Sequence, residues 1–167
     1  MTQKEKVVIP NDILLADVVS MLSAGHTVTL RAKGDSMFPF IVGDRDCVVL
    51  QKSGNVQEGD IVLARLYGKG YVLHRVYRMS GDDIILMGDG NVCAKERCRA
   101  EDICGTALKI IRGGRHITCC SPKERWKVRF WKMLLPVRRP ILGIYRHWQQ
   151  WNRGRENIRA GKGYADE

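Results

Sequence analysis

The sequence predicts a mainly β protein: a rolled antiparallel β domain with a short N-terminal helix and a C-terminal helical tail. Three patterns support this prediction. Near the N-terminus, apolar residues recur at helical spacing. The middle of the chain consists of short apolar stretches separated by Gly- and Asp-rich turns. Near the C-terminus, apolar residues again recur at helical spacing, with Lys and Arg between them. A chain of 167 residues, 44% of them hydrophobic, can bury a real core. We therefore expect an N-terminal helical segment at 1–25, a β domain at 26–120 and a basic amphipathic tail at 121–167.

The N-terminal segment has the pattern of a short amphipathic helix. Asn11 is a suitable N-cap, apolar residues from Ile13 to Leu22 recur at helical spacing, and Gly25 fits the position just after a helix. The first residues lack the long apolar core of a signal peptide, and no run approaches the ~18 residues needed to span a bilayer. We therefore expect a cytoplasmic protein, either free or peripheral on a membrane, with its six cysteines reduced.

The middle of the chain contains stretches with the length and composition of strands. They are Thr27–Ala32, Cys47–Lys52, Asp60–Leu66, Tyr71–Tyr77, Asp83–Met87, Ile103–Ile110 and His116–Cys120. Sequences typical of turns, such as KSGN, YGKG, SGDD and RGGR, separate most of them. Short strands at this spacing are typical of an antiparallel domain that is partly rolled or barrel-like.

The tail combines apolar residues at helical spacing with a strong positive charge. Pro136 and Pro140 should break or kink the helix, and Pro140 fits the first turn of a second one. Ten Lys and Arg oppose the single acid Glu124 between Ser121 and Arg155, so this segment carries +9 of the net charge of +10. Such a segment favours an anionic partner for the tail alone. Three interpretations remain open: an interfacial helix pair on an anionic membrane, a stripe packed on the β domain, and, less favoured, nucleic-acid binding.

Three short motifs contain residues that could perform chemistry. Ser36 lies in GDSMFP, His74 in VLHRV and Asp89 in GDGN. A serine nucleophile needs an exposed hydroxyl, a base within reach and hydrogen-bond donors for the oxyanion. Taken singly, the three motifs indicate only a strand-to-turn junction, a partly buried histidine and a tight turn. Their occurrence together is what favours a catalytic site.

In this order, GDSMFP, GDIVLARL, LHRV and GDGN resemble the S24/S26-type serine peptidase clan, which contains signal peptidase I and the LexA-like self-cleaving repressors. That clan has a G-x-S-M-x-P box, a G-D-x-V strand, a basic catalytic residue before a valine, and a G-D-x-N box. The repressors and typical bacterial signal peptidases use lysine as the base. This chain resembles the histidine branch, found in archaea, the endoplasmic reticulum and some bacteria. The resemblance covers about 28–111 and implies a serine endopeptidase of the signal-peptidase type.

The resemblance also implies a role for each motif residue. Ser36 would be the nucleophile, His74 the general base that later protonates the leaving amine, and Asp89 the acid that orients the base. Glu96 is a second candidate acid, although it lies slightly further along the chain than the pattern expects. Some signal peptidases have a hydroxyl residue where this chain has Gly34, so the oxyanion hole would depend on backbone N–H groups, beginning with that of Ser36.

These expectations describe an endopeptidase without a cofactor or metal that cuts a precursor or leader peptide after a small residue. Cys93, Cys98 and Cys104 lack CxxC spacing and do not favour zinc. One rival is a self-cleaving repressor-like regulator, although the chain offers one N-terminal helix instead of a helix-turn-helix and has no lysine at the base position. The other rival is a non-catalytic β module whose tail binds a membrane or nucleic acid.

Overall fold

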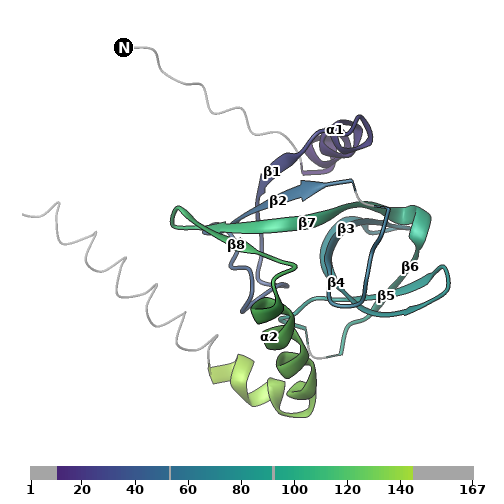
Figure 1. Cartoon of the computed structure of the whole chain (residues 1–167). Coiled ribbons are helices and arrows are strands. Elements are labelled where there is room, and N and C mark those ends of the chain that lie inside the picture. The colour runs from purple at the N-terminus through teal and green to yellow at the C-terminus, as the bar shows by residue number, and fades with distance from the viewer. Residues whose placement is uncertain (1–10, 53, 92, 145–167) are drawn as a thin grey trace, which may run out of the picture. The chain divides into compact units, whose positions relative to one another are not determined.

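The computed structural model describes residues 11–144 except 53 and 92 (Figure 1). The chain forms two compact units, 1–129 and 130–167. The first unit contains the β domain and all three sequence motifs. None of the helices in the described residues is long and apolar enough to cross a bilayer.

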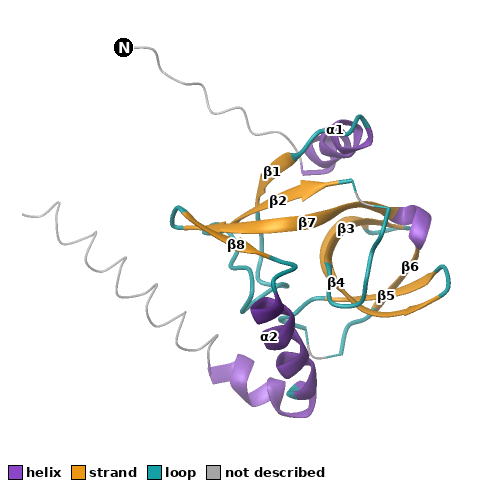
Figure 2. Cartoon of the chain, viewed as in Figure 1, coloured by secondary structure: helices purple, strands orange, loops and turns teal. Residues whose placement is uncertain are grey.

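The described residues form one antiparallel sheet of eight strands, which confirms the mainly β fold class (Figure 2). The strands are β1 (Val28–Arg31), β2 (Cys47–Gln51), β3 (Ile61–Leu66), β4 (Gly70–Ser80), β5 (Asp83–Met87), β6 (Glu96–Arg99), β7 (Ile103–Arg112) and β8 (Arg115–Thr118). Their order is β1-β2-β7-β3-β4-β5-β6, and β8 pairs with β7. Seven strands match those expected from the sequence, and β6 was not predicted.

Turn residues determine how the hairpins close. Gly113 and Gly114 link β7 to β8 with φ angles of 53° and 78°. Both angles are positive, as a two-residue hairpin turn of the favoured type requires, and glycine adopts them at little cost. The sequence signal RGGR therefore marks a real hairpin, and the register pairs Arg112 with Arg115 across it.

Two buried clusters form the core. The first joins the β1, β2, β3 and β7 side of the sheet to helix α1 (Asn11–Ser23). Val18 and Leu22 of α1 belong to it, and Leu22 lies so close to Gly105 that a β-carbon there would meet it at 2.9 Å. Gly25 follows α1 with a φ of 86°, as expected from its position in the sequence.

The second cluster lies where β3, β4, β5 and β6 curl together. It contains Val62, Val76, Leu86 and Cys98, with Val72 packed against it. Strand register pairs Val62 with His74 and Leu86 with Glu96. Because paired residues point to the same face of a sheet, His74 and Glu96 are placed on the face of this cluster.

The tail begins with helix α2 (Pro122–Met133). Ser121 caps it, since its hydroxyl accepts the Glu124 N–H at 3.4 Å and Pro122 occupies the first helical position. A 3₁₀ turn, η2 (Leu135–Val137), interrupts the helix, and helical structure resumes at 138, so Pro140 lies in a first turn as expected. The predicted tail residues from 145 onward, including Trp148 and Trp151, lie outside the described residues.

Candidate active site

Ser36 lies in the loop 32–46 that joins β1 to β2. The two ends of this loop are tied together: the Asp44 N–H donates to the Ala32 carbonyl at 2.8 Å, and the Ala32 N–H donates to the Asp46 carbonyl at 2.9 Å. Gly34, two residues before the serine, has a φ of 70° and open space around it. Glycine there satisfies a backbone conformation that other residues rarely adopt.

A buried carboxylate anchors the far end of the loop. Asp46 accepts hydrogen bonds from the Val42 N–H at 2.9 Å, Arg45 Nε at 2.8 Å and Arg112 Nη2 at 2.8 Å. Burial alone raises the pKa of this carboxyl, but the hydrogen bonds from Arg45, Arg112 and Val42 outweigh it and lower the pKa to about 2. Arg112 also donates to the Phe40 carbonyl at 2.8 Å. The loop is therefore fixed to β7.

Two glycines of the GDGN box, and one glycine of the loop itself, lie directly against the backbone around Ser36. β-Carbons on Gly88 and Gly90 would overlap the carbonyl oxygens of Ser36 and Asp35, and one on Gly43 would overlap the backbone of Gly34. The Gly90 N–H also donates to the Ser36 carbonyl at 2.8 Å. Gly43 and the glycines of the GDGN box thus allow the close backbone contacts that position the serine.

His74 is buried in β4 and bonded to a carboxylate on β6. Its Nδ1 lies 2.6 Å from Glu96 Oε2, and Lys69 Nζ lies 3.6 Å from the other oxygen of the same carboxylate. Since a carboxylate only accepts, the His74 Nδ1–H donates to it. This bond places the proton of a neutral ring on Nδ1 and leaves the lone pair on Nε2.

Asp89 lies elsewhere, against Arg75. The Arg75 guanidinium donates to both Asp89 oxygens, with Nη2 at 2.6 Å from Oδ2, and also to the Gly59 carbonyl at 2.6 Å. Arg75 follows His74 in β4, so its side chain points to the opposite face of the strand. The structure thus places Glu96 against the imidazole, where the sequence pattern had suggested Asp89, and gives Asp89 a partner on the other face.

Ser36 and His74 line the same cavity, with a volume of about 390 Å³. The other walls are mainly apolar and include Leu14 and Leu15 of α1, Leu30 of β1 and Leu63 of β3. Within the described residues, the Ser36 hydroxyl and the His74 ring are not hydrogen-bonded to each other. Such bonds are often loose before substrate binds. The cavity brings together a hydroxyl, an imidazole and, behind the imidazole, a carboxylate.

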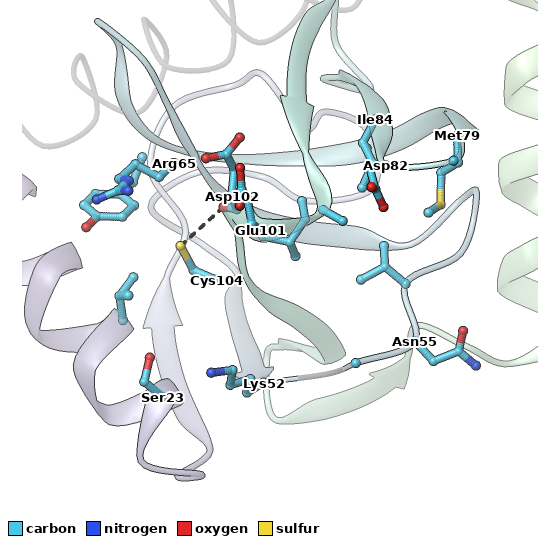
Figure 3. Close-up of a pocket in the computed structure, with 17 residues that line it drawn as sticks. Ser23, Lys52, Asn55, Arg65, Met79, Asp82, Ile84, Glu101, Asp102 and Cys104 are labelled. Carbon is cyan, nitrogen blue, oxygen red and sulfur yellow. Dashed lines mark hydrogen bonds between the residues drawn. The ribbon is translucent and has the colours of Figure 1, made fainter.

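A second hollow, of about 670 Å³, has different chemistry (Figure 3). Its lining includes Lys52, Arg65, Asp82 and Glu101, so it mixes charges of both signs. Burial raises the pKa of the Cys104 thiol on its wall, which makes that sulfur a weaker nucleophile at neutral pH. No set of His, Cys, Asp and Glu side chains suited to holding a metal occurs in the part of the chain that the structure describes.

An antiparallel β domain with a serine and a carboxylate-bonded histidine at one cavity has the arrangement of a serine-peptidase-like protein. Residues 2–110 match the model of the Peptidase S24-like family, which is more than half of the chain. The chain therefore belongs to the Peptidase S24-like family, which contains serine peptidases and self-cleaving repressors. The LexA repressor of Petrotoga mobilis (strain DSM 10674 / SJ95) is 28% identical over 86 residues, or 50% of this chain and 42% of the relative. The chain thus spans less than half the length of this curated relative.

Proposed function

We propose that the protein is a serine endopeptidase in which Ser36 is the nucleophile, His74 the general base and Glu96 the acid that orients the base. The observation that carries this proposal is the 2.6 Å contact between His74 Nδ1 and Glu96 Oε2, made by a histidine that shares its cavity with Ser36. A carboxylate on Nδ1 favours the tautomer whose Nε2 accepts a proton, and it stabilises the imidazolium that then forms.

The chemistry has two halves. Ser36 Oγ attacks the scissile carbonyl while its proton passes to His74 Nε2; the C–N bond then breaks and the same proton goes to the leaving amine. Water next attacks the Ser36 ester, gives a proton to Nε2, and the proton returns to Ser36 as the carboxylic acid is released. Within the described residues the Ser36 N–H has no acceptor, so it can donate to the oxyanion.

The proposed substrate is a peptide or protein precursor, such as a leader peptide, cut after a small residue. The first test incubates the full chain with a mixed peptide library and reads new termini by mass spectrometry. We expect a consistent residue before the cut, and loss of cleavage by about 10⁴-fold or more in Ser36→Ala and in His74→Ala, with both variants still folded. Cleavage that survives His74→Ala would remove histidine from the mechanism.

A second candidate is self-cleavage in the manner of a repressor, which the similarity to a LexA repressor supports. The two functions differ in their dependence on concentration, because cleavage within one molecule has a first-order rate that dilution leaves unchanged. Fragments of the chain itself would appear at that constant rate and would be absent from Ser36→Ala. If instead library peptides are cut and the chain stays intact, the protein acts on other molecules.

A further inference from the structure

Helix α2 exposes a stripe of large apolar side chains. Trp126 is 71% exposed, Phe130 50% and Met133 73%. Spacings of four and three residues align these side chains along one side of the helix. The match to the Peptidase S24-like family ends at residue 110, so this helix lies outside it.

The first half of α2 shows which side of the helix faces the β domain. The Val128 side chain lies over Gly59, and Arg125 contacts Asp60 at 3.5 Å and Gln57 at 3.2 Å. A residue two positions from Val128 lies nearly opposite it on a helix, because each residue turns the chain by about 100°. Trp126 therefore lies opposite the side of the helix that contacts the β domain.

Cations flank the stripe. Lys123 and Arg129 each lie three residues from Trp126, on its two sides, and both are exposed. Lys127 is paired with Glu124 at 2.6 Å, which is the only acid in α2 against five Lys and Arg. An apolar centre with Lys and Arg at its edges suits a bilayer interface, where long cationic side chains reach the headgroups.

We propose that α2 binds an anionic lipid surface, with the stripe in the acyl boundary and Lys123 and Arg129 at the phosphates. Single-stranded nucleic acid would also meet the positive charge, and its bases stack on aromatic rings. Among the described residues that follow Phe130, however, the large exposed apolar side chains are non-aromatic: Met133, Val137, Ile141 and Ile144. Aliphatic side chains gain free energy by leaving water for lipid and offer bases no stacking partner.

The test is flotation of the full chain, in a Ser36→Ala background, with vesicles of phosphatidylcholine alone or with phosphatidylglycerol. We expect binding only to the anionic vesicles, weakening as salt is raised. The stripe variant Trp126→Gln/Phe130→Gln should bind at least roughly tenfold more weakly. The charge variant Lys123→Gln/Arg129→Gln should also lose about tenfold at low salt.

The matched control is Tyr67→Gln, because Tyr67 is an equally bulky, fully exposed aromatic residue (106%) at the β3–β4 turn. It should bind as the unchanged chain does. Equal binding by the stripe variant and the control, equal binding to neutral vesicles, or no vesicle binding would each overturn the proposal. Single-stranded DNA that binds while vesicles do not would assign the cations to nucleic acid. Because Ser36 is absent from this assay, the result is independent of the peptidase proposal.

Discussion

His74 and Arg75 are neighbours in β4, and each is joined to an acid from a later segment, yet the two pairs differ in their surroundings. His74 of the His74–Glu96 pair lines the cavity that Ser36 also lines, and Glu96 keeps 14% of its side-chain surface exposed. The Arg75–Asp89 pair lies on the other face of the strand, and the Asp89 side chain is only 5% exposed. Alternation along one strand thus separates a pair suited to proton transfer from a pair suited to holding structure.

The contacts of Arg75 explain why an arginine follows the histidine. Its guanidinium donates to Asp89 and to the Gly59 carbonyl, and it lies 4.9 Å from the centre of the Phe40 ring. These partners come from the GDGN box, the GD box before β3 and the loop that contains Ser36. Arg75 therefore connects three motifs. Some residues of the motif pattern thus hold the structure together, in addition to those proposed to act in catalysis.

The sharpest test of the difference is Glu96→Gln. An amide can turn its NH₂ toward His74 and favour the wrong tautomer, so we expect kcat/KM for library peptides to fall by about 10³- to 10⁴-fold. The free energy of unfolding should change little, because Glu96 is partly exposed. Steady-state kinetics and urea denaturation measure the two effects. A loss below tenfold would mean that Glu96 does not orient the base.

The opposite result is expected for Arg75→Met. It leaves the buried Asp89 carboxylate without its main cation, and breaking a buried pair in this way typically costs about 3–5 kcal/mol of folding free energy. Urea denaturation of the variant measures this loss. In the double variant Arg75→Met/Asp89→Asn the uncompensated charge is gone, so part of the stability should return. A single variant within 1 kcal/mol of the unchanged chain would contradict a structural role for the pair.

Asp46 is a third carboxylate to compare, and its contribution to the free energy of unfolding should depend on pH. Its pKa in the folded chain is lowered to about 2 from 3.8, so its contribution is complete above pH 4 and is lost as the pH falls toward 2. A shift of this size corresponds to about 2 kcal/mol. Denaturation of the unchanged chain and of Asp46→Asn at several pH values should give curves that converge by about pH 2. Parallel curves would show that Asp46 is not the titrating group.

Lys69 should have the smallest effect. It lies 3.6 Å from Glu96 but is 63% exposed, and ion pairs with such exposed groups contribute little. We expect Lys69→Gln to lower kcat/KM by less than about threefold, measured in the assay used for Glu96→Gln. A loss approaching that of Glu96→Gln would instead give Lys69 a direct part in positioning the carboxylate.

Most of the fold could be predicted from sequence because its strands are apolar and its turns contain glycine. Strand β6 escaped prediction because three of its four residues, Glu96, Arg97 and Arg99, are charged, and only Cys98 is buried. Short, charged strands are common at the ends of sheets and lack the apolar signal of an inner strand. The strand that was missed is the one that positions Glu96, so the acid could be named as a candidate but its place beside His74 could not.

The site itself was only partly accessible from sequence. Alternation in β4 correctly groups His74 with Val72 and Val76, because period two is a local property. The partner of Asp89 could not be predicted, because it depends on a contact between segments that are distant in sequence. Residue spacing alone does not show whether a carboxylate contacts His74 or Arg75. The glycines of the GDGN box were interpreted as turn residues, whereas their larger role is steric and involves a segment fifty residues earlier in the chain.

That steric contact has a consequence for the order in which the protein is made. Ser36 leaves the ribosome long before Gly88 and Gly90, which lie against the backbone of its loop, and before Glu96, which is bonded to His74. A nascent chain that ends before Gly88 contains Ser36 and His74 but not the later residues that contact them. Under the proposed mechanism, the catalytic geometry therefore forms only when the later strands have joined the sheet.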